Sequence, residues 1–386
     1  MLKFGILGIG QGGSNIAEYA YTKGFQAVVV NTAQVDLEQI KYIPNSSKIY
    51  LGGMGAGRNR EIGMQAMIEN AEKILEKCQE EFKECDALFI ASTGGGGTGS
   101  GGLPVGLEIL LSFHKYVGVI IVLPDENESP KAKMNTLECF SQISEFENLG
   151  SVLIIDNQRG KQNYDISRKF LYNKVNKEII DLLIELNELT DQPSYVSNFD
   201  ACDFLNIIQE RGYTLLSKTV FYSGEDDSKF DISKKIRESW YKTCQPIFSD
   251  NQIVKAAILG KVPEKISSKV DINIIFQETG IPFDFTDIYF NPDPSSMIDN
   301  LSGKIKSQFY TIFSGLEFPQ QSLNRMSDSL KNIESKLISS LEKSQTQRFE
   351  TEQWNNKFQR RVVGIGSLKQ DKVTKIDLMS KLTKFK

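Results

Sequence analysis

A run of eight residues, Gly94–Gly101, contains six glycines and constrains the fold of this chain more than any other segment. Only Thr98 and Ser100 interrupt the glycines, so the backbone N–H groups of the run can close around an oxyanion such as phosphate. The apolar residues 87–91 predict a buried strand before the run, and the apolar positions after Pro104 predict a helix whose positive end faces the loop. A flexible linker is not expected directly between a strand and a helix, so the run indicates a phosphate-binding loop.

A second glycine-rich turn follows the first predicted strand, residues 4–7. Gly8, Gly10 and Gly13 have the spacing of a dinucleotide-binding fingerprint. That fingerprint expects an acidic residue at the end of the second strand, whereas the second predicted strand here ends in Asn31 and acidic residues follow a few positions later. An NAD-dependent oxidoreductase is therefore disfavoured but stays an alternative. A P-loop enzyme is excluded, because no Gly-Lys-Ser/Thr triplet follows the long glycine run.

Length and composition set wider bounds. A chain of 386 residues exceeds what one core usually holds, so we expect two or three domains. There is no run of eighteen apolar residues and no cleavable signal at the start, which predicts a cytoplasmic protein with no membrane partner. The five cysteines lack paired or Cys-x-x-Cys spacing and predict reduced thiols. His114 is the single histidine, so histidine-dependent acid–base chemistry and His-ligated metal sites are poor candidates.

The charge of the chain is unevenly distributed along the sequence. The formal net charge is −4, but the segment Lys357–Lys386 has nine basic residues against two acidic ones, a net charge of +7. A basic tail on an acidic body predicts an electrostatic partner, the alternative being a tail that is merely solvated.

The long glycine run also resembles the Gly-Gly-Gly-Thr-Gly-[Ser/Thr]-Gly signature of the tubulin/FtsZ superfamily. Three further loops are similar to that family's nucleotide loops in the same order: residues 10–13, Asn31-Thr32, and Gly53–Asn59, which taken alone fits a mobile surface turn. The resemblance implies GTP or GDP as ligand, with Mg²⁺ beside Gln11. It implies that the nucleotide is bound by Gly10, Gln11, Gly12, Asn15, Asn31, Gly55, Ala56, Gly57, Arg58, Asn59, Gly95, Gly96, Gly97, Thr98 and Gly99.

The nucleoside contacts that the resemblance implies lie further along the chain. Glu128 stands where the family binds ribose, and Asn157 follows a predicted strand at the position that reads the purine edge. Tyr172 and Asn176 are four residues apart, which puts both on one face of a helix, where one can stack on a base and the other bond its edge. Guanine is favoured over adenine by the resemblance. The alternative for Tyr172 alone is ordinary packing.

A predicted helix that is apolar nearly all round, residues 170–190, is expected to be buried between two layers. Asn198, Asp200 and Asp203 then resemble the Asn-x-Asp-x-x-Asp loop that, in the family, enters the nucleotide site of the next subunit and positions the attacking water. The alternative is that the two carboxylates are an N-cap and a first-turn acid and nothing more.

These observations predict an α/β fold of the tubulin/FtsZ type. The expected parts are a Rossmann-like parallel-sheet GTP-binding domain, a central core helix, a smaller α+β domain, a long C-terminal helix and a basic tail. Their expected bounds are 1–169, 170–190, 191–319, 320–357 and 358–386. Within them the sequence predicts helices at residues 16–22 and 230–241, and strands at residues 117–123, 152–155, 253–260, 272–276 and 309–313.

The end of the chain is similar to the TubZ branch of the superfamily, which is encoded on plasmids and phages. The resemblance implies a bacterial GTPase that forms head-to-tail filaments and segregates plasmid or phage DNA, its tail engaging a DNA-bound adaptor of the TubR type. Alternatives are an FtsZ-like cell-division filament, a nucleotide-binding regulator that does not polymerise, and the oxidoreductase.

Overall fold

A computed structural model describes residues 1–164, 166–192, 199–222, 229–248, 253–263, 284–290, 303–304 and 306–346. By their contacts the residues group into two units, Met1–Met326 and Ser327–Lys386. Asn198, the tail 358–386 and a strand predicted at 272–276 lie outside the described residues. The fold confirms the predicted α/β class, whereas the five-part division into domains stays a prediction.

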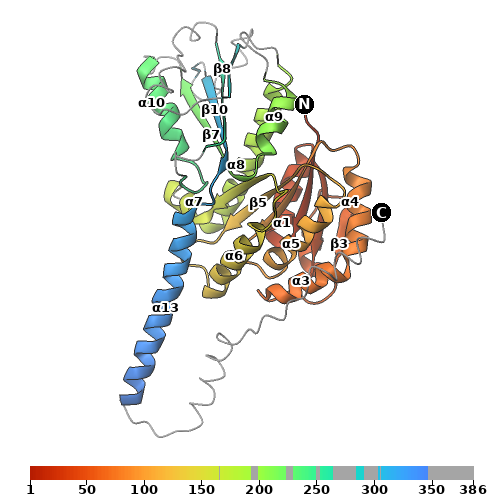
Figure 1. The fold of residues 1–386 in the computed structure, drawn as a ribbon, viewed down its shortest axis with the longest axis vertical. Coiled ribbons are helices and arrows are strands. Elements are labelled where there is room, and N and C mark those ends of the chain that lie inside the picture. Colours follow the sequence, from red (N-terminus) through yellow and green to blue (C-terminus); the bar gives the residue numbers. More distant parts are fainter. Residues whose placement is uncertain are drawn as a thin grey trace. The chain divides into compact units, whose positions relative to one another are not determined.

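The described strands form one ten-stranded sheet in the order β3-β2-β1-β4-β5-β6-β7-β10-β8-β9 (Figure 1). Pairing is parallel from β3 through β7, antiparallel on both sides of β10, and parallel between β8 and β9. The strands are β1 (Phe4–Ile9), β2 (Gln26–Asn31), β3 (Lys48–Tyr50), β4 (Ala87–Thr93), β5 (Val117–Leu123), β6 (Ser151–Asp156), β7 (Gly212–Tyr222), β8 (Lys255–Val262), β9 (Phe285–Phe290) and β10 (Lys306–Leu316).

Helices cover the sheet and connect its strands (Figure 1). Among the described residues they are α1 (Gly10–Thr22), α2 (Gln34–Glu38), α3 (Arg60–Glu69), α4 (Ala71–Phe82), α5 (Thr98–Leu111), α6 (Pro130–Ile143), α7 (Asn157–Asn163), α8 (Arg168–Leu189), α9 (Ala201–Ile208) and α10 (Lys229–Trp240), with a 3₁₀ turn at Asn45–Ser47. A further helix, α13 (Gln320–Thr346), follows β10. No helix among the described residues is long and apolar enough to cross a membrane.

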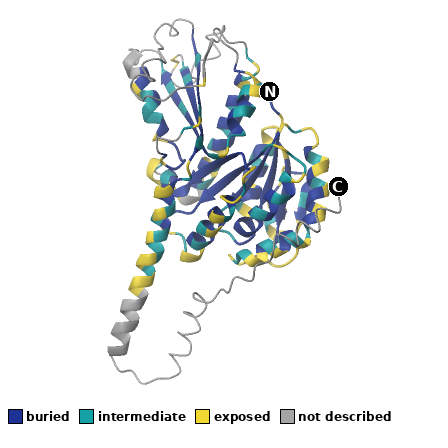
Figure 2. Cartoon of the chain, in the orientation of Figure 1, coloured by how far each residue is buried: buried dark blue, intermediate teal, exposed yellow. Residues whose placement is uncertain are grey.

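The central parallel strands are buried on both faces, which explains their nearly continuous apolar sequences. Every residue of β1, β5 and β6 is buried, as the dark blue strands of Figure 2 show. Within the sheet, β2 lies on one side of β1 and β4 lies on the other, so the order of the strands reverses at β1. The crevice at the carboxyl ends of β1 and β4 is therefore the topological switch point, where open α/β sheets bind their ligands.

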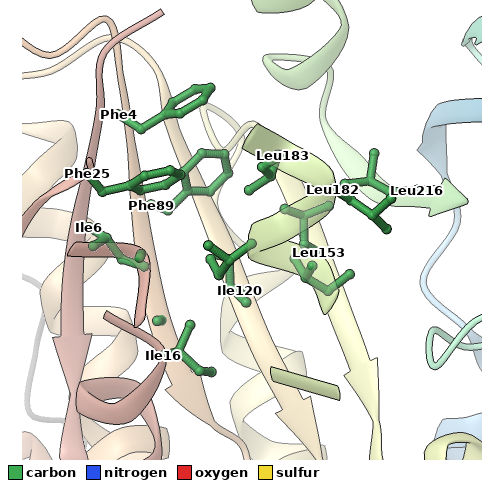
Figure 3. Packing of buried hydrophobic residues seen from close by; sticks show 14 of the residues in the cluster. Phe4, Ile6, Ile16, Phe25, Phe89, Ile120, Leu153, Leu182, Leu183 and Leu216 are labelled. Atoms are coloured by element: carbon green, nitrogen blue, oxygen red, sulfur yellow. The ribbon is translucent and has the colours of Figure 1, made fainter. Parts of the chain in front are cut away.

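Helix α8 packs its apolar face into the core between the N-terminal strands and β7 (Figure 3). Leu182 and Leu183 lie near Leu153 of β6, and Leu216 of β7 adjoins them. Burying an aliphatic side chain of this size stabilises the fold by about 1.5–3 kcal/mol. The expectation that this helix is apolar all round is wrong for its first half, because Lys177 is exposed there.

Two helices begin earlier than the sequence suggested. The first was expected at residues 16–22 and the second after Pro104, but α1 starts at Gly10 and α5 at Thr98. The glycines lie inside the first turns because those turns pack against backbone. A Cβ atom at Gly13 would lie 2.2 Å from the carbonyl oxygen of Ala91. The glycine runs are thus partly helix N-termini and not only loops.

Elements of the C-terminal part agree more loosely with the sequence. The helix expected at 230–241 is α10, the strand expected at 253–260 is β8, and the strand expected at 309–313 is the middle of β10. Strand β7 joins the parallel part of the sheet through two residue pairs only, Ser151 with Gly212 and Val152 with Tyr213.

Candidate functional site

The site forms where β1 and β4 end and α1 and α5 begin. Gly10 has φ +72°, a conformation that favours glycine, and its Cβ position lies 3.0 Å from the backbone nitrogen of Gly99. A Cβ atom at Gly12 would lie 2.3 Å from the Thr93 side chain. The first glycine turn and the long glycine run are therefore in direct contact, and both need the absence of side chains.

Two helix N-termini meet in this crevice without side-chain caps. Neither Ile9 before α1 nor Gly97 before α5 gives a capping hydrogen bond, and neither helix has an acidic residue in its first turn. By contrast, Asn59 caps α3 by accepting from Glu61 N at 3.0 Å. First-turn N–H groups that no side chain caps carry partial positive charge, so the crevice suits an anion.

The loop before α3 packs against the long glycine run. Cβ atoms at Gly97 would lie 2.8 Å from both Ala56 Cβ and the Asn59 backbone, which leaves room for glycine alone. Gly55 and Gly57 have positive φ angles of +98° and +54°. The predicted phosphate residues of the two loops are thus brought together.

Asn135 of α6, which the sequence analysis missed, holds these loops in place. Its buried amide nitrogen donates to the carbonyl oxygen of Arg58 at 2.9 Å and lies 3.3 and 3.4 Å from those of Gly95 and Gly96. Arg58 is exposed, with φ +62°, and its guanidinium donates to Ser129 Oγ. No motif marks Asn135 in the sequence, where it is one polar residue in a mixed helix.

Arg60 is a second residue that the sequence analysis missed. Pro104 lies inside α5 and has no N–H to donate to the carbonyl oxygen of Ser100, four residues earlier. Arg60 Nη2 donates to that oxygen at 3.1 Å, and Nη1 forms an ion pair with Glu138 at 2.8 Å. The arginine therefore supports the glycine-rich first half of α5.

Asn31 and Thr32 shape the end of β2. Asn31 is buried, accepts from Ala33 N at 3.2 Å and donates to Asp36 at 3.0 Å, so its side chain holds the turn. The Thr32 and Thr98 hydroxyls lie 2.6 Å apart, which connects this turn to α5.

The predicted nucleoside residues lie on α7, α8 and the β5–α6 loop. Asn157 Oδ1 and Asn176 Oδ1 are buried and have no hydrogen-bond partner among the described residues. Buried amide oxygens are normally bonded, so both atoms fit a ligand that supplies donors. The Tyr172 hydroxyl lies 3.4 Å from Glu128 Oε1 and 3.5 Å from Asp125 Oδ2, which brings the predicted base and ribose residues together.

Asp200 and Asp203 form a capping box at the start of α9. Asp200 Oδ1 accepts from the backbone N–H groups of Cys202 at 2.8 Å and Asp203 at 3.0 Å, and Asp203 Oδ2 accepts from Asp200 N at 3.2 Å. Within this chain the pair is therefore the N-cap and first-turn acid that the alternative interpretation expected. Asp200 is nevertheless exposed, and Asp203 half-buried.

The glycine loops lie at the carboxyl ends of the parallel strands, and α9 lies toward their amino ends. Asn187, near the end of α8, exchanges hydrogen bonds of 2.8 Å with the backbone of Leu2, at the amino end of β1. The glycine turn starts at the other end of β1, about 23 Å away for seven extended residues. The Phe204 ring of α9 lies 6.2 Å from the ring of Phe4 at the amino end of β1, so Asp200, which caps α9, lies away from its own chain's glycine loops.

The donor set near α1 suits a magnesium ion that is held mainly by phosphates. Gln11 and Asn15 are exposed one helical turn apart, and Gln11 offers a carbonyl oxygen, a ligand type that Mg²⁺ takes. The described residues contain no group of three or more His, Cys, Asp or Glu side chains placed to hold a metal ion. Mg²⁺ in phosphate sites needs only one or two protein ligands, so the residues fit it.

Two other cavities lie away from this crevice. One, of about 320 Å³, lies at the amino ends of β4 and β5 and is lined by His114, Tyr116 and Ile208 among others. The second, of about 770 Å³, lies between α8, β7 and α10 and is rich in charged side chains. Neither contains a residue of the glycine loops.

Comparison with known proteins identifies relatives over part of the chain. Residues 3–165 match the family model described as Tubulin/FtsZ family, GTPase domain. The chain is 32% identical over 249 residues to the tubulin-like protein TubZ of Bacillus cereus, covering 59% of this chain and 57% of the relative. It is 31% identical over 246 residues to the tubulin-like protein CetZ of Pyrococcus furiosus, covering 61% and 65%. The chain thus spans less than two thirds of these relatives' lengths.

A solved structure shares the fold over most of the chain. It is the GTPγS-form protofilament of Bacillus thuringiensis serovar israelensis TubZ, with a TM-score of 0.73, 18% identity, and coverage of 89% of this chain and 94% of that one. At this identity the likeness shows the fold alone.

Proposed function

Because residues 3–165 match the GTPase-domain model of the Tubulin/FtsZ family, we propose that this protein binds and hydrolyses GTP and assembles into filaments. The observation that carries the proposal is the meeting of two uncapped helix N-termini at the switch point of the sheet, with two buried, unpartnered amide oxygens at the nucleoside end. The first feature suits phosphates and the second suits a base that donates hydrogen bonds.

The phosphates would be bound mainly by backbone N–H groups of residues 10–12, 56–58 and 95–99. The N–H groups of Gly55 and Asn59 donate within the chain, to Thr32 O at 3.1 Å and Ala56 O at 2.8 Å, and hold the loop. The exposed guanidinium of Arg58 would add a charge-assisted contact. Gln11 would hold Mg²⁺, which when bound neutralises charge on the phosphates.

The base is proposed to be guanine. Its edge presents an N–H and an NH₂ as neighbouring donors, which two amide oxygens, Asn157 Oδ1 and Asn176 Oδ1, can accept together. Adenine offers only one donor group on its corresponding edge. Tyr172 would stack on the base, and Glu128 would accept from a ribose hydroxyl.

Hydrolysis is proposed to need a second copy of the chain. Asp200 and Asp203, at the start of α9, lie toward the amino ends of the parallel strands, whereas the glycine loops of the same chain lie at their carboxyl ends. Asn198 precedes them in the sequence. Stacking copies head to tail would place the start of α9 over the phosphates bound by the next copy. A carboxylate there would hold water in line with the terminal phosphate, and phosphoryl transfer depends mainly on such positioning.

The filament is proposed to segregate plasmid or phage DNA in a bacterial cytoplasm. Similarity to TubZ supports this, together with a tail of net charge +7 that suits a DNA-bound adaptor of the TubR type.

Two measurements test the core of the proposal. Titration of the protein with GTP, ATP and NAD is expected to show tight binding of GTP alone. Electron microscopy is expected to show filaments with GTP, and longer-lived ones with a slowly hydrolysed analogue. Preference for NAD, or binding of GTP without assembly, would exclude the proposed function.

A further inference from the structure

We propose that Arg325, in the second turn of α13, is a positioning residue for the nucleoside end of the site. The inference rests on the proposed GTP-binding function and adds a residue from a C-terminal element to it. Residues 320–326 belong to the same unit as the sheet, so the contacts of Arg325 lie within one body.

The first contact of Arg325 is with Asp156, the last residue of β6. Asp156 is fully buried, and its carboxylate caps α7 by accepting from Gln158 N at 2.9 Å. Arg325 Nη2 lies 3.0 Å from both Asp156 oxygens, and Ser322 Oγ donates to Oδ2 at 2.8 Å. The charge of this carboxylate is therefore balanced by α13, because a buried carboxylate requires a paired cation.

Asp156 directly precedes Asn157, whose Oδ1 is buried and without a partner among the described residues. The carboxylate that Arg325 holds also fixes the first turn of α7, on which Asn157 lies. Loss of the guanidinium would leave Asp156 buried with Ser322 and one backbone N–H. The Asp156 side chain would then have to rotate, or a water molecule would have to enter beside it, and either change would move the Asn157 amide.

The second contact of Arg325 is with the loop that carries Glu128. Arg325 Nε lies 4.0 Å from Glu126 Oε1, and Glu126 N donates to Gln158 Oε1 at 3.2 Å. Arg325 thus touches both segments that provide predicted nucleoside contacts. One arginine spanning two such segments can fix their spacing, because its planar guanidinium and Nε–H present donors in a rigid arrangement.

The test compares nucleotide affinity in full-length variants, measured by calorimetry with GDP and ADP below the concentration at which filaments form. Arg325→Met is expected to weaken GDP binding about tenfold or more and to reduce the preference for GDP over ADP. Arg325→Lys is expected to recover part of both, since it restores the charge but not the forked geometry. Lys331→Met is the control, because Lys331 is exposed on the same helix and, among the described residues, its ion pair is with Asp328 of that helix.

A merely structural role would lower the melting temperature without changing the GDP-to-ADP preference. Ser322→Ala, which keeps the ion pair, is expected to fold and to show a smaller loss of GDP affinity. In an Asp156→Asn background, Arg325→Met is expected to add little further loss.

Affinity and preference within twofold of wild type in Arg325→Met would overturn this inference and leave GTP binding intact. If Arg325→Met does not fold, unchanged affinity and preference in both Arg325→Lys and Ser322→Ala overturn it instead. Wild-type protein that binds no GDP would overturn the proposed function, and the inference with it.

Discussion

The Thr32 and Thr98 hydroxyls lie 2.6 Å apart, and both side chains are buried. This contact connects the end of β2 to the first residue of α5, two elements whose sequences are 66 residues apart. It places the turn that contains Asn31 beside the long glycine run.

Thr32→Val keeps the side-chain shape and removes one hydroxyl, leaving that of Thr98 without this partner. We expect the free energy of unfolding to fall by about 1–2 kcal/mol, the usual cost of a buried polar group that loses its bond. Urea denaturation measures the change. Thr22→Val is the control, because its hydroxyl bonds Tyr19 O at 2.7 Å on the exposed end of α1. Equal losses in the two variants would contradict the prediction.

Two neighbouring glycines of the long run, Gly96 and Gly97, are expected to differ sharply in how much their replacement by alanine destabilises the fold. A Cβ atom at Gly97 would lie 2.8 Å from Ala56 Cβ and the Asn59 backbone, whereas one at Gly96 would lie 3.2 Å from Thr93 Oγ1 and 4.0 Å from its next neighbours. Gly97→Ala should therefore lower the free energy of unfolding by about 1–3 kcal/mol, and Gly96→Ala by much less. Because Gly97→Ala pushes two phosphate loops apart, GTP affinity and assembly should fall together. Wild-type GTP affinity in folded Gly97→Ala would show that the run does not bind phosphate.

Asp203→Asn separates capping from catalysis. The amide oxygen can still accept from Asp200 N, so α9 should form, but the charge that positions water is lost. We expect GTP binding to persist and turnover to fall by about 10²–10⁴-fold, leaving filaments that do not disassemble.

The control for that variant is Asp191→Asn, an exposed carboxylate just after α8 that pairs with the N-terminus. It should hydrolyse GTP like wild type. Wild-type turnover in Asp203→Asn, or turnover per wild-type molecule that does not depend on protein concentration, would show that the site is not shared between copies.

Glu178 is expected to make stability depend on pH. Burial raises the pKa of its carboxyl above the ordinary 4.5, against the lowering effect of a 2.8 Å hydrogen bond from Tyr164. A carboxyl with a raised folded-state pKa contributes stability that is fully present below the unfolded pKa and is lost as pH rises through the folded one. Glu178→Gln should therefore gain stability relative to wild type over the range in which the pH rises above the ordinary 4.5. Parallel unfolding curves for the two proteins across this range would contradict the assignment.

Truncation after Gln353 removes the whole +7 segment beyond the predicted nucleotide residues. GTPase activity should remain close to that of the full chain, while binding to an adaptor–DNA complex should be lost. Added salt should weaken that binding in the full chain, because it screens charge and favours counterion retention. Binding that salt or truncation leaves unchanged would exclude the tail as the contact.

Much of the fold was predictable because its strands and glycine turns are local signals. The apolar runs of β1, β4, β5 and β6 and the glycines between them gave the parallel core. The predicted starts of α1 and α5, at residue 16 and after Pro104, were later than the observed starts at Gly10 and Thr98. Glycine is a poor helix former in isolation, and only packing against backbone explains its place in these first turns.

The candidate site was predictable where it depends on short motifs and not where it depends on long-range contacts. Asn135, Arg60 and Arg325 carry no motif, and each acts on a residue at least 40 positions away in sequence. Their partners are backbone carbonyls or a buried carboxylate, which only the assembled fold brings near them.

The contact between Arg60 and the Ser100 carbonyl ties the two residues to Pro104. Pro104 leaves the Ser100 carbonyl oxygen without a backbone donor, and Arg60 supplies one. Replacing Arg60 alone therefore has a different effect from replacing Arg60 and Pro104 together. Among diverged sequences of this fold, replacement of Pro104 by a residue with an N–H should relax selection on Arg60, and the two positions should covary. A designer who replaces Pro104 would therefore release position 60 from this one requirement, leaving its ion pair with Glu138 as the constraint.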